Sequence, residues 1–418
     1  MALSNQSKVI FYNILSLFSI QGLNYLLPLV NIPYMVRVLG PDKYGVLGFS
    51  AAFIAFFNIL IVFGFNLSGA QQISIHRTNL QNRSKTLCTI ILSQLIIALI
   101  SLVIMILILS ASSKLNEHYQ IHIYYFLVSV ITILQPAWFF QGMEKMKFIT
   151  LTTFISKAIF TLGIFLLIKK PSHYVLVPKL MFIGGCVGSI LTLLILKYKF
   201  HIIYYRPSFR DITDQIQKSK YIFFSDIVTS AYTQSVTFIL GVFHSNAVVG
   251  YFSAVDKLIK ACQGLFQPIV TAFFPYITKT VNIDKRKIRL VLRKLLLGFA
   301  ISSVFFGTGL FLFSNQIIDI VFGVEFIPSK AVLRIMSANI PLVAIASILA
   351  SLIFIGFGKS EKLSKIYTIS AFLALILAFI LIPVSGERGA AYTVLGAEAA
   401  STTLMLTYLW IKKKEVFY

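Results

Sequence analysis

Long apolar stretches separated by short polar connections make up most of the chain. Twelve of these stretches reach about 20 residues, the length that a helix needs to cross the hydrocarbon core of a bilayer. The pattern predicts an all-α integral membrane protein with twelve transmembrane helices, at approximately residues 10–33, 44–68, 86–110, 121–141, 149–168, 174–196, 220–242, 248–277, 290–313, 331–355, 364–383 and 389–411.

Composition supports this class. Of the 418 residues, 57% are hydrophobic and 12% are charged, whereas about 25% are charged in a typical soluble domain. The net charge of +23 does not indicate nucleic-acid binding, because the basic residues lie in short connections beside apolar stretches. The three cysteines lie inside apolar stretches without metal-binding spacing, which argues against disulfides and zinc. The first stretch is too long for a cleavable signal peptide.

Lysine and arginine are unevenly divided between the two sides of the predicted membrane. If both termini face the cytoplasm, 25 basic residues lie on the cytoplasmic side, 9 lie on the outer side and 3 lie within spans. Cytoplasmic loops of membrane proteins carry an excess of Lys and Arg. The distribution therefore predicts that both termini are cytoplasmic.

The chain also has signs of an internal duplication. Gly45 and Gly250 open the second and eighth spans and are 205 residues apart, as are Pro136 and Pro341 in the fourth and tenth spans. If each half has an even number of spans, both halves have the same orientation in the membrane. The axis that relates the two repeats then lies along the membrane normal. We expect two six-helix lobes, residues 1–205 and 206–418, with a central cavity between them.

The eighth stretch, residues 248–277, carries charges where an apolar helix should have none. Asp256, Lys257 and Lys260 lie about 15–20 Å along this helix, near the membrane midplane. A Lys or Asp at the centre of a membrane helix costs about 2.5–3.5 kcal/mol, so such residues normally face a cavity or the bundle interior. We interpret Lys257 and Lys260 as part of a cationic cavity. The alternative is a local ion pair between Asp256 and Lys260 that serves only folding.

A third deep lysine, Lys157, lies in the fifth span, in the other half of the chain. Cations contributed by both halves suit an anionic ligand such as a diphosphate. Arg37 and Arg334 lie nearer the outer edge, where they could line the mouth of the cavity. For Arg37, however, we favour a salt bridge that stabilises the following turn through Asp42.

Acidic residues within spans are the candidates for ion coupling. Asp226 lies early in the seventh span, Glu398 lies about ten residues into the twelfth, and Asp256 lies in the eighth. Buried carboxylates in transporters bind H⁺ or Na⁺, and the sequence leaves both ions open. Their alternative role is to neutralise a buried lysine.

Prolines within spans predict breaks in the helices. We expect Pro28 and Pro33 to interrupt the first span and Pro268 to interrupt the eighth, because proline lacks a backbone donor. No catalytic constellation is found. Gly358-Lys359-Ser360 lacks the first glycine and the preceding strand of a phosphate-binding loop, and His118 and His122 have no third ligand nearby. We therefore expect a non-enzyme without a cofactor.

Five sequence motifs resemble those of one transporter family. They are Arg37-Val38-Leu39-Gly40-Pro41-Asp42-Lys43-Tyr44-Gly45, Trp138-Phe139-Phe140-Gln141-Gly142-Met143-Glu144-Lys145-Met146-Lys147, Gly250-Tyr251-Phe252-Ser253-Ala254-Val255-Asp256-Lys257, Phe322-Gly323-Val324-Glu325-Phe326, and Gly389-Ala390-Ala391-Tyr392 with Glu398. In this order they are similar to the bacterial polysaccharide transporter family and its O-antigen flippases (Wzx), within the multidrug/oligosaccharidyl-lipid/polysaccharide exporter superfamily. One departure is that Pro136-Ala137-Trp138 lacks the Asp that often precedes the loop glutamine.

The resemblance implies a fold like that of multidrug exporters (MATE) and a role in lipopolysaccharide biosynthesis. The implied substrate is an undecaprenyl-diphosphate-linked oligosaccharide, turned from the cytoplasmic to the periplasmic face of the inner membrane by alternating access. Membrane lipids, H⁺ or Na⁺, and other polysaccharide-assembly proteins are the implied partners. The alternatives are a lipid II flippase and a multidrug antiporter. A membrane glycan polymerase is disfavoured, because the longest connection, residues 197–219, has only about 20 residues.

Overall fold

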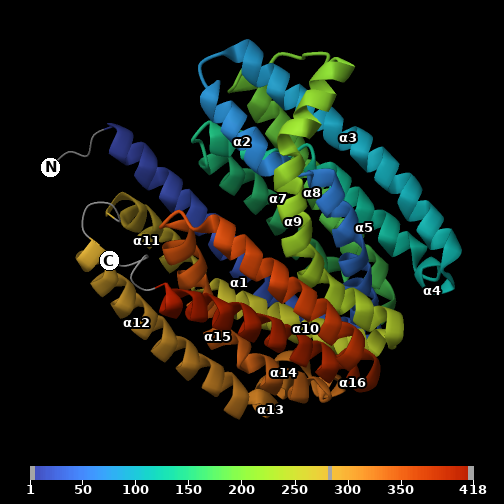
Figure 1. Cartoon of the computed structure of the whole chain (residues 1–418). Helices are drawn as coiled ribbons and strands as arrows, with labels where there is room; N and C mark the ends of the chain where they lie inside the picture. The colour runs from blue at the N-terminus through green and yellow to red at the C-terminus, as the bar shows by residue number, and fades with distance from the viewer. Residues whose placement is uncertain (1–4, 281–284, 413–418) are drawn as a thin grey trace. The chain divides into compact units, whose positions relative to one another are not determined.

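The structure is a computed structural model that describes residues 5–280 and 285–412. Helices account for nearly all of this part of the chain, and it contains no strand (Figure 1). In the first half, the helices are α1 (Asn5–Val62), α2 (Phe65–Ile75), α3 (Leu80–Ala111), α4 (Ser113–Asn116), α5 (Tyr119–Thr132), α6 (Ala137–Gly142), α7 (Lys147–Leu167), the 3-10 helix η1 (Pro171–Val175) and α8 (Leu176–Tyr198).

The second half continues in the same manner and contains two π-helical segments, η2 and η4. Its helices are α9 (Phe209–Phe243), α10 (Asn246–Gly264), α11 (Gln267–Thr280), α12 (Lys285–Leu312), α13 (Ser314–Ile317), η2 (Ile318–Phe322), the 3-10 helix η3 (Val324–Phe326), α14 (Ser329–Ser337), α15 (Asn339–Ser347), η4 (Ile348–Ile355) and α16 (Ser360–Ile411).

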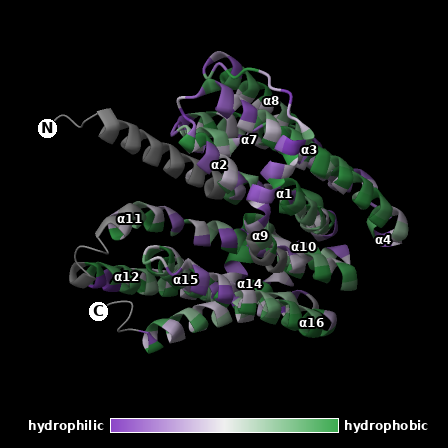
Figure 2. Ribbon diagram, turned by 45° about the horizontal axis from the view of Figure 1, so that its top comes forward, coloured by the Kyte–Doolittle hydropathy of each residue, from purple (hydrophilic) through white to green (hydrophobic). Residues whose placement is uncertain are grey.

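Eight helical segments in the described part of the chain are long and apolar enough to cross a membrane. Figure 2 shows hydrophobic residues along most of the length of α3 and α16. At 1.5 Å per residue, the 52 residues of α16 would extend about 78 Å, more than twice the hydrocarbon thickness. The helix is kinked at Gly386, where φ is 53°, and the kink separates the two spans predicted there. The all-α membrane class is confirmed, while the count of twelve spans stays a prediction.

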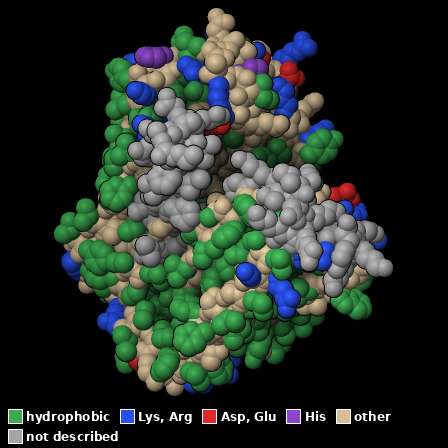
Figure 3. Space-filling model, turned by 90° about the vertical axis from the view of Figure 1, so that its left-hand side faces the viewer, with side chains coloured by type: hydrophobic (Ala, Val, Ile, Leu, Met, Phe, Trp, Pro, Cys, Tyr) green, Lys and Arg blue, Asp and Glu red, His purple; other side chains and the backbone are tan. Residues whose placement is uncertain are grey.

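Helix α3 shows how the chain is adapted to lipid. Its buried side includes Ser93, Gln94 and Ser101, whereas Leu99 and Leu107 are more than 60% exposed. A helix in water has the opposite arrangement, with leucine inside and polar residues outside. Hydrophobic side chains also cover much of the face drawn in Figure 3. The exposed apolar surface indicates that α3 faces hydrocarbon.

The prolines affect the helices unequally. The predicted break at Pro268 is confirmed, because α10 ends at Gly264 and α11 begins at Gln267. The predicted interruptions at Pro28 and Pro33 are wrong, since α1 continues through both. The non-helical residue of α1 is Gly40, with φ 70° and ψ 171°. Membrane helices tolerate proline where neighbouring groups satisfy the freed carbonyls, and glycine reaches positive φ without strain.

The prolines at equivalent positions of the two halves both lie at helix breaks. Pro136 precedes α6 after α5 has ended at Thr132. Pro341 lies in the first turn of α15, directly after α14 ends at Ser337. The predicted fourth and tenth spans are therefore both divided near these residues. This similarity is consistent with the internal duplication inferred from the sequence.

The chain forms two compact units. The N-terminal unit comprises described residues within 1–23 and 50–230, and the C-terminal unit comprises those within 24–49 and 231–418. The core of the N-terminal unit includes Phe65, Phe139 and Phe200. In the C-terminal unit, an apolar core forms around η4 and includes Leu349 and Phe354. Part of α1 thus belongs to the unit formed mainly by the second half of the chain.

A contact between glycines holds this part of α1 in the C-terminal unit. A Cβ atom on Gly45 would lie 1.7 Å from the carbonyl oxygen of Asn246, and one on Gly250 would lie 2.0 Å from that of Pro41. The close approach continues at Gly48, where an added Cβ would lie 2.6 Å from Oγ of Ser253. Small residues allow membrane helices to approach this closely. Gly45 and Gly250, paired by the 205-residue offset, are therefore packing partners.

We predict opposite effects for two glycine-to-alanine substitutions. Gly250→Ala should lower the unfolding temperature in detergent by several degrees, because overpacking a close contact costs about 1–3 kcal/mol. Gly298→Ala in α12 is the matched control, because a Cβ added there would meet no described neighbour within 4 Å. It should leave the unfolding temperature unchanged or raise it, since alanine favours helix more than glycine does. Equal unfolding temperatures for the two variants would contradict the close packing of Gly250 against α1.

Candidate functional site

Helix α10 brings two of the charged residues of the eighth stretch to a small pocket inside the C-terminal unit. The pocket has a volume of about 60 Å³. Its charged lining residues are Asp256 and Lys260 from α10 and Glu398 from α16. The remaining lining residues are Val236, Thr237, Phe252, Ile259, Gln263, Met336, Asn339, Ala374, Thr393, Val394 and Ala397. We call this cavity the acidic pocket.

An ion pair and several oxygen atoms determine the chemistry of the acidic pocket. Lys260 Nζ donates to Oδ2 of Asp256 at 2.8 Å, so the local pair considered as an alternative is present. Asp256 is buried, and the Lys260 side chain is about half exposed. Asn339 Oδ1 is buried and accepts no hydrogen bond from the described residues. Since a water needs about 10–15 Å³, the pocket has room for a few waters or a small cation.

Lys257 lies on a different part of α10. Its Nζ lies over the ring of Tyr44, 5.0 Å from the centroid, and it does not line the acidic pocket. Tyr44 belongs to the part of α1 in the same unit and is almost completely buried. A cation over an aromatic face is stabilised by about 0.5–2 kcal/mol. Lys257 thus contacts the Tyr44 ring, whereas Lys260 pairs with Asp256.

Two other predicted residues belong to the N-terminal unit. Lys157 lies in the middle of α7 and is half-buried. The side chain of Asp226 lies outside the described residues. Next to Lys157 in sequence, Ser156 faces Gly188 of α8, and the Gln135 amide donates to the carbonyl of Gly185 at 2.9 Å. The sequence analysis did not identify this half-buried polar group around Gln135, although a glutamine in an apolar stretch directly before Pro136 was a detectable signal.

The two arginines near the predicted outer edge have different roles. Arg37 donates to the backbone carbonyls of Ile320 and Val321. It does not pair with Asp42, whose carboxylate lies 3.0 Å from Lys43 Nζ. The expected Arg37–Asp42 salt bridge is therefore wrong, because the guanidinium satisfies carbonyls at the end of η2 instead.

Arg334 lines a second and larger cavity of about 650 Å³ in the C-terminal unit. Its Nε donates to Ser314 Oγ at 2.9 Å, and an Nη atom donates to Asn315 Oδ1 at 3.3 Å. Arg388 of α16 lines the same cavity. The acidic pocket and this cavity have no lining residue in common.

Comparison with known families is decisive for the class of protein. Residues 10–281 match the sequence profile of the family described as "Polysaccharide biosynthesis protein", which is well over half of the chain. The chain belongs to this polysaccharide biosynthesis family. The resemblance inferred from the five motifs is thereby confirmed.

Two relatives match this family member over nearly its whole length. Both carry the name "Putative O-antigen transporter". The relative from Escherichia coli strain K12 is 27% identical over 95% of this chain and 96% of its own. The relative from Shigella dysenteriae is 29% identical over 94% of this chain and 98% of its own.

Two solved structures show the same fold. The lipid II flippase MurJ in an inward closed conformation has a TM-score of 0.71 at 17% identity, covering 96% of this chain and 87% of that one. An inward-facing multidrug MATE transporter has a TM-score of 0.72 at 14% identity, covering 93% and 96%. This member of the polysaccharide biosynthesis family is therefore a multi-pass membrane protein with a MurJ- and MATE-like fold.

Three of the motifs lie together in the C-terminal unit. Arg37 contacts the carbonyls before Gly323, and a Cβ on Gly40 would lie 2.9 Å from Oε2 of Glu325. The ring of Tyr251 packs edge-on against Phe326, with 5.7 Å between centroids. These motifs therefore set backbone turns and close packing in the region in which they meet.

The tryptophan motif has a similar role in the N-terminal unit. A Cβ on Gly69 of α2 would lie 2.6 Å from the Trp138 ring, so glycine permits this contact. Arg77 donates to the carbonyl of Gly142 at 2.7 Å and pairs with Glu144 at 2.8 Å. The motif thus packs α6 against α2.

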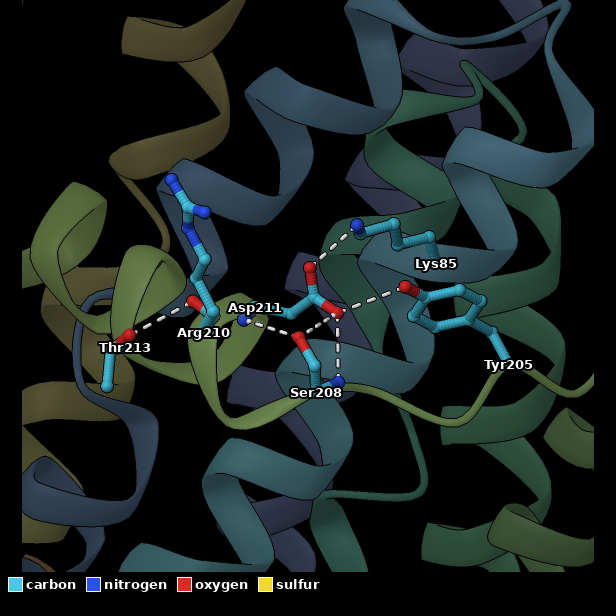
Figure 4. Close-up of polar contacts among 6 residues, drawn as sticks. All are labelled: Lys85, Tyr205, Ser208, Arg210, Asp211 and Thr213. Carbon is cyan, nitrogen blue, oxygen red and sulfur yellow. Dashed lines mark hydrogen bonds and ion pairs between the residues drawn. The ribbon is translucent and has the colours of Figure 1, made fainter.

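Within the N-terminal unit, the connection from α8 to α9 is tied to the start of α3 (Figure 4). Asp211 accepts hydrogen bonds from Ser208 N and Oγ, both at 2.9 Å, and from the Tyr205 hydroxyl at 3.0 Å. Lys85 Nζ lies 2.6 Å from the other carboxylate oxygen of Asp211.

These contacts lower the pKa of Asp211. The contact with Lys85, followed by those with Ser208 and Tyr205, holds the pKa of Asp211 well below its usual value. Because the folded pKa is depressed, this stabilisation is complete above the unfolded value of about 3.9 and is lost as pH falls toward the folded value.

We predict that Asp211→Asn lowers the unfolding temperature at neutral pH. A hydrogen bond to a charged group contributes about 1.5–3 kcal/mol, and the half-exposed Lys85 places the pair at the lower end of this range. The difference from wild type should be constant between about pH 5 and 8 and should shrink below about pH 4. Unfolding in detergent, followed by size-exclusion chromatography after heating, measures the effect. The control is Asp214→Asn, one turn later and exposed; an equal loss from this control would remove the special role of Asp211.

Proposed function

We propose that this protein is a flippase for lipid-linked oligosaccharide repeat units of O-antigen type. The observation that carries the proposal is the pair of relatives named as O-antigen transporters, which match this chain almost from end to end. The fold shared with a lipid II flippase supports it, because that protein also handles a lipid-linked saccharide. The proposed substrate is an undecaprenyl-diphosphate-linked oligosaccharide in the inner membrane of a bacterium.

The proposed direction is from the cytoplasmic to the periplasmic face. The 25 to 9 distribution of lysine and arginine supports twelve spans with both termini in the cytoplasm. A transporter of this kind alternates between states open to either side. Because a ligand shifts an equilibrium only by its difference in affinity between two states, the substrate must bind them unequally. The polyprenyl tail stays in the lipid while the polar head crosses.

The charge of the substrate gives the deep lysines their proposed role. Lys157 and Lys257 are half-buried in spans of the N-terminal and C-terminal units. A lysine ammonium is a flexible point charge suited to a diphosphate. The ion pair with Asp256 at 2.8 Å places Lys260 in the acidic pocket. We propose Lys157 and Lys257 as the main diphosphate contacts, because both lie deep within predicted spans.

The acidic pocket has a different proposed role. Its volume of about 60 Å³ is far below the roughly 300–1,000 Å³ of a pocket for an organic ligand. It can hold H⁺ on a carboxylate or a small hydrated cation. We propose that Glu398 and Asp256, balanced by Lys260, couple transport to an H⁺ or Na⁺ gradient. A membrane potential supplies about 2.3 kcal/mol per charge per 100 mV for this work.

A lipid II flippase is the second candidate, and the fold of MurJ favours it. One experiment separates the two functions. The gene is introduced into a strain lacking its O-antigen flippase and, separately, into a strain depleted of its lipid II flippase. We expect restored surface polysaccharide in the first strain and no rescue of growth in the second. The reverse result would assign the protein to lipid II.

We predict that neutralising a deep lysine strongly reduces transport without loss of protein. Lys157→Gln and Lys257→Gln should each reduce surface glycan about 10–100-fold, because a charge-assisted contact to phosphate contributes about 1.5–3 kcal/mol. Lys257→Arg should retain part of the activity. The readout is surface polysaccharide normalised to membrane-inserted protein in the complemented strain.

The matched control for these variants is Lys362→Gln, an exposed lysine in the first turn of α16. It should support wild-type amounts of glycan. Wild-type glycan from the double variant Lys157→Gln/Lys257→Gln would remove both lysines from the substrate path.

We predict that Glu398→Gln uncouples transport from the ion gradient. The amide keeps the size of the side chain but can neither release a proton nor attract a cation. In vesicles, flipping by the variant should proceed at the same slow rate with and without an imposed pH or Na⁺ gradient. If the variant responds to the gradient as wild type does, coupling does not involve Glu398.

A further inference from the structure

The cavity that contains Arg334 and Arg388 takes no part in the function proposed above. Helices α12, α14, α15 and α16 line it, and its lining residues include Phe311 of α12, Arg334 of α14, Pro341 of α15, and Arg388 and Tyr392 of α16. Its volume of about 650 Å³ is in the range of pockets that hold organic ligands. We call it the arginine cavity.

The two guanidinium groups in this cavity have no carboxylate partner in the described part of the chain. Arg334 is held by Ser314 and Asn315, which are neutral acceptors and leave its charge uncompensated. Arg388 lines the cavity and is exposed. By contrast, Lys330 on the same helix as Arg334 pairs with Asp319 at 3.0 Å. Two positive charges at one apolar cavity thus remain available for an anion.

The walls of the arginine cavity are suited to a lipid. Val304, Phe311 and Tyr392 are each about half exposed. Helix α12, which supplies four of the lining residues, is the least covered of the eight apolar segments, with only 17% of its apolar window buried. A helix so little covered by protein faces hydrocarbon. A membrane lipid can therefore reach the cavity by lateral diffusion and place its apolar part against these side chains.

We propose that the arginine cavity binds an anionic phospholipid of the outer leaflet, with the phosphate between Arg334 and Arg388. The planar guanidinium donates two parallel hydrogen bonds to phosphate oxygens, a geometry that a lysine cannot provide. Phe311 and Tyr392 contact the glycerol and the first methylenes of the acyl chains. The assignment to the outer leaflet rests on the orientation given under the proposed function. The phosphate chemistry does not depend on that orientation.

The location of the charges favours a bulk phospholipid over the lipid carrier. The carrier diphosphate must reach the deep lysines, whereas Arg334 lies in the first third of a predicted span and Arg388 precedes the twelfth. A bulk phospholipid is also present at far higher concentration and occupies a site of modest affinity by mass action. Such a lipid stabilises the C-terminal unit by joining α12, α14 and α16 through one phosphate.

Native mass spectrometry of the full-length protein tests the proposal. The protein is reconstituted in nanodiscs of equal parts phosphatidylglycerol and phosphatidylethanolamine, and the lipids retained after release are counted. Wild type should retain phosphatidylglycerol in preference to phosphatidylethanolamine. Arg388→Gln and Arg334→Gln/Arg388→Gln should reduce phosphatidylglycerol retention about tenfold, and Arg334→Lys/Arg388→Lys should be intermediate. Lys114→Gln, at an exposed position in α4, should match wild type.

Several results would overturn the proposal. Unchanged phosphatidylglycerol retention in Arg388→Gln would do so, and this variant remains decisive if the double variant fails to fold. Equal retention of the zwitterionic lipid would remove the role of charge. Displacement of phosphatidylglycerol by undecaprenyl diphosphate at one tenth of its concentration would assign the cavity to the carrier instead. Lipid retention is measured without transport, so a failure of the proposed flippase function leaves this test unaffected.

Discussion

The free energy of placing a charge or an unpaired backbone group in hydrocarbon governs how this chain is built. On α3 it turns serine and glutamine inward and leucine outward. At the end of η2 it brings the Arg37 guanidinium to the carbonyls of Ile320 and Val321. In α10 it pairs Asp256 with Lys260. A polar group in an apolar stretch is therefore informative, and where its partner lies on another element, as for Arg37, it shows which segments lie together.

Features that depend on this constraint could be predicted from the sequence. Apolar runs revealed the all-α membrane class, and Pro268 marked the division between α10 and α11. The deep charges of α10 were evident because aspartate and lysine are rare in such runs. The 205-residue offset paired Gly45 with Gly250, which the structure places in direct contact. The family followed from the order of five short motifs.

Other features depend on packing that a single sequence does not contain. Residues three apart lie about 60° apart around a helix, and from this spacing we predicted that Lys257 and Lys260 line one cavity. The structure places Nζ of Lys257 over the Tyr44 ring and pairs Lys260 with Asp256, contacts that the spacing alone did not indicate. Asn339 and Thr393 reach the acidic pocket from other helices, and nothing local marked them. Pro28 and Pro33 were misleading because α1 continues through both, and the non-helical residue of this helix is Gly40.

The assignment of residues 24–49 to the C-terminal unit has a consequence for biosynthesis. This segment leaves the ribosome long before residue 231, where the rest of its unit begins. At about 5–20 residues per second, the interval is roughly 10–40 s. During that time the glycine face of the segment has no native neighbour, so insertion machinery or lipid must shield it. This part of α1 thus completes these contacts only after α10 and the residues up to Glu325 have been synthesised.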